Sequence, residues 1–137
     1  TNAAGGNTEY KGAIGSAVTK LFDMQIGVTG LTETAAQKAE IEVITATASS
    51  KTRAEYYPNA LPIKIKLIVR KDNQEIVGAQ IISGEEVTQR INALSFAIQK
   101  HMTVSELAKA DTAYAPPLNE TWEPMITAAE LVLMKLR

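Results

Sequence analysis

The chain has 137 residues, of which 45% are hydrophobic and 21% are charged, and its formal net charge is −1. This length suggests one domain that buries about two-thirds of its unfolded surface. The charge is near neutral and no dense basic cluster occurs, which argues against a nucleic-acid partner. No apolar run approaches the roughly 20 residues that span a bilayer, so we expect no membrane segment. There is no cysteine, which excludes disulfides, thiolate metal sites and a cysteine nucleophile within the chain.

The first part of the chain predicts an extended lead-in, then short strands and a helix. Residues 1–12 are rich in glycine and asparagine and show little periodicity. The strings GSAVTKLF and MQIGVTG follow and are typical of short strands. Gly30 precedes LTETAAQKAE, which predicts a short helix with Thr32 as its N-cap, because a hydroxyl there satisfies an unpaired backbone amide.

The middle of the chain predicts an antiparallel sheet. IEVITATASS is rich in β-branched residues and predicts a strand. In PIKIKLIVRK, Ile63, Ile65 and Leu67 alternate with lysines, the pattern of a half-buried antiparallel strand. KDNQ is a polar turn, and EIVGAQIIS completes a hairpin. Gly78 in this last strand indicates a bulge or a close approach of another backbone.

The last part of the chain changes to a helical period. Apolar residues three and four apart predict an amphipathic helix over residues 85–101. Thr103 and Glu106 form a capping box that starts a short helix. Pro124 suits the first turn of a last helix over residues 123–136. The predicted fold class is α+β: an antiparallel β-sheet of three to five strands covered on one face by helices.

The sequence contains no familiar catalytic signature. Neither G-x-G-x-x-G nor G-x-x-x-x-G-K-[ST] is present, and a lone histidine, His101, predicts a helix C-terminal residue and no metal site. Four carboxylates are explained by helix capping and solvation: Glu85, Glu86, Glu106 and Asp111. Because no nucleophile pairs with a base, an enzyme confined to this chain is the least favoured interpretation.

The tyrosines next to proline carry more information. Tyr56 and Tyr57 precede Pro58, and Tyr114 lies in DTAYAPPLNETWEP, before Pro116 and Pro117. Proline fixes its own φ and drives the preceding residue toward extended backbone, so these phenols stand on stiff loops. Side chains at successive extended positions point to opposite faces, so at most one of the first two shares a site with Tyr114. The alternative is that both loops pack against the sheet edge.

Trp122 lies in the same string, just before the last predicted helix. A large apolar side chain with one N–H group is expected to pack in the core and to anchor the turn into that helix.

Four strings together resemble the C-terminal dimerisation domain of pyridine nucleotide–disulfide oxidoreductases. They are YYPNALPIKIKLIV, IVGAQI, QRINALSFAI and MTVSELAKADTAYAPPLNETWEP. The branch is that of NADH oxidases, NADH peroxidases and coenzyme A–disulfide reductases. The earlier string IGSAVTKLFDMQIGVTGLTE resembles the segment that leaves the FAD domain. The resemblance implies residues 1–30 as a lead-in from the FAD domain of a parent enzyme and residues 31–137 as the dimerisation domain.

The resemblance also implies a function. The parent would be a cytoplasmic, homodimeric FAD-dependent NAD(P)H oxidoreductase acting on oxygen, peroxide or coenzyme A disulfide or polysulfide. Its FAD and NAD domains would precede this chain, so the chain alone is expected to bind no FAD, NAD(P)H, coenzyme A or metal and to be inactive. Tyr56 and Tyr114 would reach the partner subunit's reactive cysteine. The alternative is a stand-alone, self-associating interaction module with no catalytic activity.

Overall fold

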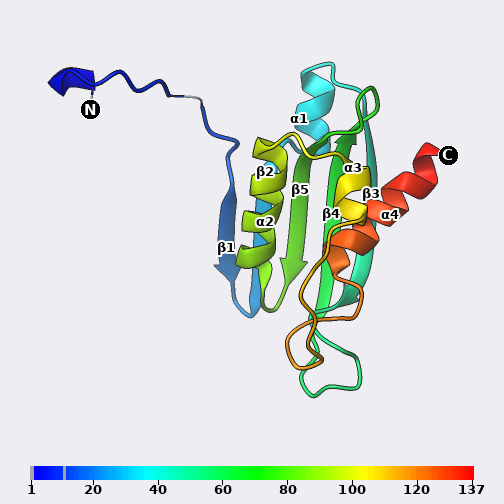
Figure 1. Ribbon diagram of the computed structural model, residues 1–137. Helices are drawn as coiled ribbons and strands as arrows, with labels where there is room; N and C mark the ends of the chain where they lie inside the picture. Colours follow the sequence, from blue (N-terminus) through cyan, green and yellow to red (C-terminus); the bar gives the residue numbers. More distant parts are fainter. Residues whose placement is uncertain (1, 11) are drawn as a thin grey trace.

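A computed structural model describes residues 2–10 and 12–137 and shows one antiparallel sheet with helices packed on it (Figure 1). The strands are β1 (Ala17–Leu21), β2 (Met24–Gly30), β3 (Val43–Lys51), β4 (Pro62–Arg70) and β5 (Ile76–Ser83). The helices are η1 (Asn2–Ala4), α1 (Glu33–Lys38), α2 (Val87–Gln99), α3 (Val104–Ala108) and α4 (Pro124–Leu136). The five strands lie in the order β1-β2-β5-β4-β3. The predicted α+β class with an antiparallel sheet is confirmed.

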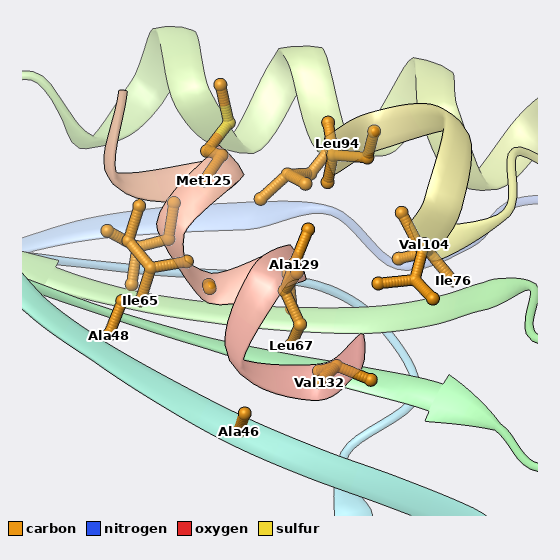
Figure 2. Packing of buried hydrophobic residues seen from close by; sticks show 14 of the residues in the cluster. Ala46, Ala48, Ile65, Leu67, Ile76, Leu94, Val104, Met125, Ala129 and Val132 are labelled. Carbon is orange, nitrogen blue, oxygen red and sulfur yellow. The ribbon is translucent and has the colours of Figure 1, made fainter. Parts of the chain in front are cut away.

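One face of the sheet is covered by α2, α3 and α4, and the hydrophobic core lies between them. The alternation predicted for β4 is confirmed, because Ile63, Ile65 and Leu67 are at most 1% exposed. The small side chains of Ala46 and Ala48 on β3 leave room for α4 to pack closely (Figure 2). Fully burying one such aliphatic side chain contributes about 1.5–3 kcal/mol, so this layer holds the domain together.

The other face is covered only at one end, by α1. Lys66 points away from the core, and its Nζ pairs with the Glu33 carboxylate of α1. Gly78 pairs with Ile68 in the sheet, and a Cβ at Gly78 would lie 1.8 Å from the carbonyl oxygen of Leu31. The predicted close approach at this glycine is therefore confirmed, and it lets the α1 segment lie directly on the sheet.

The rest of that face is open and carries an apolar patch. Leu21 stands opposite Met24, and Ile26 stands opposite Ile82 in the strand register. These four side chains are between 39% and 56% exposed. An apolar cluster on an uncovered sheet face is typical of a surface that meets another protein surface.

The local signals at the helix ends are confirmed. Thr32 caps α1, where its Oγ1 accepts a hydrogen bond of 3.1 Å from the Ala35 amide. Thr103 and Glu106 form both bonds of the capping box that starts α3. Pro124 lies in the first turn of α4.

The predicted lead-in at residues 1–12 includes positions 1 and 11, which lie outside the described residues. In the described part, η1 is followed by a segment without helix or strand up to residue 16. β1 and β2 then join the sheet, and β2 pairs with β5. In the described ranges, no helix is long and apolar enough to cross a membrane.

Candidate functional site

The two tyrosine segments leave the sandwich at the same end. Residues 52–61 connect β3 to β4, and residues 109–123 connect α3 to α4. Figure 1 shows both loops together at the end of the sheet opposite to α1. Loops held on a rigid scaffold commonly carry binding and catalytic side chains, so this end is the candidate site.

The base of the first loop is closed by hydrogen bonds. The Thr52 amide donates to the Leu61 carbonyl at 2.8 Å, and the Leu61 amide donates to Thr52 Oγ1 at 3.1 Å. Thr52 itself is fully buried. Further out, the Tyr57 amide donates to the Ala54 carbonyl at 2.8 Å, which forms a turn. The loop is therefore anchored at its base while Tyr56 stands at its tip, 78% exposed.

The second loop is held by the side chain of Asn119. Its Nδ2 donates to the Ala113 carbonyl, and its Oδ1 accepts from the Ala115 amide at 2.8 Å. These are the two residues on either side of Tyr114, so one amide group fixes the backbone around this tyrosine. Asparagine side chains commonly replace a backbone partner in turns. The loop also contains Pro116 and Pro117, and the side chain of Asn119 closes it.

The structure places Tyr56 and Tyr114 next to each other. Interaction with the Tyr114 side chain raises the pKa of Tyr56, and the charge of Glu120 acts in the same direction. Interaction with the Thr121 side chain, and then with Tyr56, lowers the pKa of Tyr114. Both phenols remain largely exposed, at 78% and 47%. The opposite directions of the two pKa shifts indicate that the two side chains interact.

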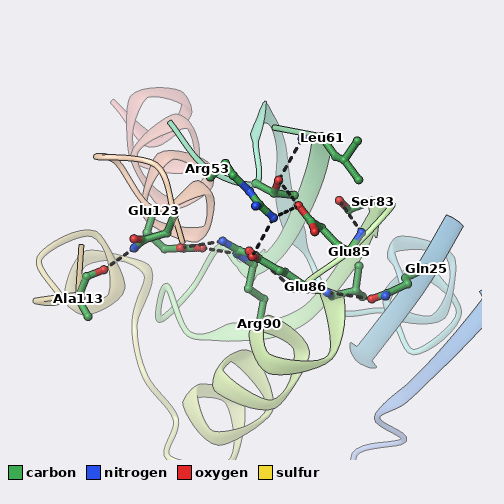
Figure 3. Close-up of polar contacts among 12 residues, drawn as sticks. Gln25, Arg53, Leu61, Ser83, Glu85, Glu86, Arg90, Ala113 and Glu123 are labelled. Atoms are coloured by element: carbon green, nitrogen blue, oxygen red, sulfur yellow. Dashed lines mark hydrogen bonds and ion pairs between the residues drawn. The ribbon is translucent and has the colours of Figure 1, made fainter. Parts of the chain in front are cut away.

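A group of ion pairs that the sequence did not predict joins α2 to the two tyrosine loops (Figure 3). Arg90 on α2 is 5% exposed and binds both carboxylate oxygens of Glu123, with Nε at 2.7 Å and Nη2 at 3.1 Å. Its Nη1 donates to the Glu86 carboxylate at 2.9 Å. Burial lowers the pKa of Arg90, but the bonds to Glu123 and Glu86 outweigh this, so the pKa is raised. Arg90 is therefore a permanent cation.

The pairs continue to the first tyrosine loop. Arg53 contacts the Glu85 carboxylate and lies 3.8 Å from that of Glu86. Thr52 Oγ1 also donates to Glu85, at 2.7 Å. The prediction that Glu85 and Glu86 serve only capping and solvation was wrong, because both join this network. Glu86 stands at the N-cap of α2, but its side chain forms no capping bond.

Two other predicted residues take no part in these ion pairs. Trp122 is 65% exposed, so the prediction that it packs in the core was wrong. Its neighbour Glu123 is the buried residue at this turn, because its carboxylate is needed by Arg90. His101 follows the end of α2, as predicted, and its Nδ1 lies 3.3 Å from the Glu75 carboxylate. Among residues 2–10 and 12–137, no cluster of three or more acidic or histidine side chains could hold a metal.

The domain is a five-stranded antiparallel sheet with helices on one face, an open apolar patch and projecting loops. This combination is typical of a domain that contacts another protein surface. Residues 16–126 match the family model described as the pyridine nucleotide-disulphide oxidoreductase, dimerisation domain. The chain belongs to this family. Its resemblance to the family, predicted from the sequence, is confirmed.

Similar proteins have several names. The chain is 42% identical over 135 residues to an NADH oxidase of Methanocaldococcus jannaschii, covering 98% of the chain and 30% of that protein. It is 35% identical over 132 residues to a CoA-dependent NAD(P)H sulfur oxidoreductase of Pyrococcus abyssi, covering 96% of the chain and 29% of that protein. The structure of an NAD-dependent persulfide reductase from A. fulgidus superposes with a TM-score of 0.92 at 41% identity, covering 98% of this chain and 25% of that one. The chain thus spans less than a third of these relatives.

Proposed function

We propose that this chain is the homodimerisation domain of an FAD-dependent NAD(P)H oxidoreductase and that it completes the active site of the partner subunit with Tyr56 and Tyr114. The observation that carries this proposal is the pair of exposed, interacting phenols on two loops anchored at their bases. Two polar groups that converge at the surface of a rigid scaffold are suited to bind a group presented by another surface.

The names of the relatives support a sulfur compound as the acceptor. The Pyrococcus abyssi relative is a CoA-dependent sulfur oxidoreductase, and the A. fulgidus protein is a persulfide reductase. We therefore favour coenzyme A disulfide or a polysulfide over oxygen or peroxide. The Methanocaldococcus jannaschii relative, an NADH oxidase, keeps oxygen as the second acceptor to be tested.

The chemistry of the phenols fits this acceptor. A tyrosine hydroxyl with its ordinary pKa of about 10 is neutral at physiological pH and can donate a hydrogen bond to a thiolate or a departing sulfur. It does so without adding a negative charge beside a sulfur that gains one. The flavin, when bound in a preceding domain, would supply the electrons. Tyr56 and Tyr114 would bind and orient the sulfur of the acceptor.

Exposed apolar side chains support the dimer. In a two-fold dimer, each surface patch meets its own copy. Besides the open patch of Leu21, Met24, Ile26 and Ile82, Phe96 on α2 is 67% exposed and Met134 on α4 is 59% exposed. The division into a lead-in at 1–30 and a domain at 31–137, the preceding FAD and NAD domains and the cytoplasmic location remain parts of this proposal.

The proposal is tested in the full-length protein that contains this chain. Tyr56→Phe and Tyr114→Phe should each slow turnover with coenzyme A disulfide by about tenfold, the effect of one lost hydrogen bond. Flavin content and the dimer mass in sedimentation should not change. Tyr57→Phe, in the same loop, is the matched control and should have no effect. Unchanged turnover in both variants would contradict the role of the phenols, and a monomer would contradict the dimer.

A reading frame without preceding dinucleotide-binding domains would favour the stand-alone module instead.

A further inference from the structure

We propose that the ion-pair chain Arg53–Glu86–Arg90–Glu123 sets the distance between the two tyrosine loops and so positions Tyr56 and Tyr114. This inference rests on the proposed function for its importance to turnover. The coupling of the two loops is a separate claim, and it depends only on contacts within this polypeptide. The four residues are positioning residues, since they act through the tyrosines.

The ion-pair chain begins and ends in the two loops. Arg53 lies in the first loop, three residues before Tyr56, and Glu123 is the last residue of the second. Between them stand Glu86, at the start of α2, and Arg90, one turn further along the same helix. Figure 3 shows the four side chains in series, with Glu86 between the two arginines. The helix α2 is thus the fixed element to which both loops are attached.

The geometry at Arg90 is restrictive. Its guanidinium uses Nε and Nη2 on the two oxygens of Glu123 and uses Nη1 on both the carboxylate and the carbonyl of Glu86. A planar fork held by two carboxylates permits one arrangement of three side chains. A lysine could not reproduce these four contacts, because it offers a single charged centre.

Glu86 adopts a backbone conformation that favours this arrangement. Its φ is +59°, in the left-handed region that few non-glycine residues occupy. In this conformation its side chain leaves the capping position and turns toward the arginines, with one oxygen 2.9 Å from Arg90 and the other 3.8 Å from Arg53. Glu85 beside it holds Arg53 and the buried Thr52 at the base of the first loop.

The second loop transmits the position of Glu123 to Tyr114. Thr121, whose side chain lowers the pKa of Tyr114, lies two residues before Glu123. Asn119 holds the backbone on both sides of Tyr114. We expect a shift at Glu123 to reach Tyr114 through the backbone of the second loop, which Asn119 holds on both sides of Tyr114.

Stability alone does not account for the buried pair of Arg90 and Glu123, which are 5% and 6% exposed. A buried ion pair is commonly no more stabilising than apolar side chains of the same volume, because its desolvation offsets the attraction. Such pairs instead favour one geometry among several that an apolar contact would permit. Two phenols that must meet one sulfur atom need this kind of restriction, since a misplacement of about 1 Å can cost much of the rate.

The test is a double-mutant cycle in the full-length dimer, with coenzyme A disulfide as the substrate. Glu123→Gln keeps the shape of the side chain and removes its charge. We expect it to lower kcat by about fivefold, and by less than about twofold when Tyr114→Phe is already present. Asp72→Asn, which breaks the exposed Arg70–Asp72 pair in the distant β4–β5 turn, is the matched control and should not change kcat. Equal effects of Glu123→Gln in both backgrounds would overturn the proposal.

A second variant and a second measurement separate this inference from the proposed function. Arg53→Gln changes a residue nearer the surface, in case Glu123→Gln does not fold, and Arg53→Lys should restore part of the lost kcat. Crystal structures of the variants should show the Tyr56 and Tyr114 hydroxyls further apart than in the unchanged protein. If Tyr114→Phe alone has no effect on turnover, the proposed function fails. The distance between the two tyrosine hydroxyls still tests whether the ion pairs hold the loops. An unchanged distance would overturn the inference.

Discussion

Two regions of the molecule are held by different kinds of contact. One is the core between the sheet and its helices, and the other is the loop end, where residues 52–61 and 109–123 meet α2. In the core, aliphatic side chains such as Ile65, Leu67 and Val132 are buried without a polar partner. At the loop end, Arg90 and Glu123 are equally buried, but they are held by charge-assisted hydrogen bonds with defined directions.

The core therefore accounts for the stability of the domain, and the loop end accounts for the exact positions of its side chains. Apolar contacts are non-directional and tolerate small shifts, so they give the domain its free energy of folding. Charge-assisted hydrogen bonds are directional and restrict geometry. The two tyrosines lie on the loops that these charge-assisted hydrogen bonds hold. Variants in the core should therefore change stability most, and variants at the loop end should change turnover most.

The largest expected effect is in the core. Leu67→Ala removes a fully buried side chain and should lower the free energy of unfolding by about 3 kcal/mol, from lost burial and the cavity left behind. Val18→Ala, at a side chain 38% exposed on β1 and outside the open apolar patch, is the matched control. Urea unfolding followed by circular dichroism measures both. Equal losses would mean that the core does not dominate stability.

The close approach at Gly78 gives the next effect. A methyl group there would lie 1.8 Å from the Leu31 carbonyl oxygen, so Gly78→Ala must displace the α1 segment and should cost about 2 kcal/mol. Gly84→Ala meets the Leu61 side chain, which can move, and should cost less. A fully stable Gly78→Ala variant would show that α1 does not pack on the sheet as described.

Variants at the loop end are expected to change turnover more than stability. Asn119→Ala removes both bonds that flank Tyr114 and should lower kcat in the full-length protein by about fivefold, while stability falls by only about 1 kcal/mol. Asn73→Ala removes a similar bond in the β4–β5 turn and should leave kcat unchanged. A loss of stability without a change in kcat would mean that Asn119 contributes to folding and does not position Tyr114.

The smallest expected effect concerns pH. The Thr103 amide, and then its hydroxyl, bond the Glu106 carboxylate and lower its pKa. A lowered pKa stabilises the fold at pH values above the ordinary carboxyl value of about 4.3, and this contribution is lost as pH falls through the lower folded value. Glu106→Gln should therefore be destabilising at pH 7 and approach the unchanged protein near pH 3. A difference that persists in acid would contradict this.

The sequence predicted the parts of the fold that local patterns encode. The alternation around Ile65, the cap at Thr32 and the capping box at Thr103 each depend on residues within a few positions of one another, so a short window contains the whole signal. A bulge or a close approach was also predicted at Gly78, because a glycine inside a strand commonly marks one of the two, and the structure shows the close approach.

The candidate site could be predicted only in part. Resemblance to a family, and not residue chemistry, selected Tyr56 over Tyr57 and paired it with Tyr114. Arg90 and Glu123 are 33 residues apart, and neither has a neighbour in sequence that indicates its partner. Trp122 was assigned to the core from its size, but the adjacent carboxylate occupies the buried position. Contacts between distant segments depend on the packed fold, so a sequence window does not contain them.

The most direct test of the account is a hybrid dimer made from two impaired variants of the full-length protein. One subunit carries Tyr56→Phe and Tyr114→Phe, and the other lacks the reactive cysteine that the family resemblance implies. If the tyrosines serve the partner subunit, the mixed dimer contains one site with an intact cysteine and intact tyrosines, and turnover with coenzyme A disulfide should return to about half of the unmodified value per dimer. Mixed dimers that turn over no faster than the homodimer carrying Tyr56→Phe and Tyr114→Phe would contradict the account.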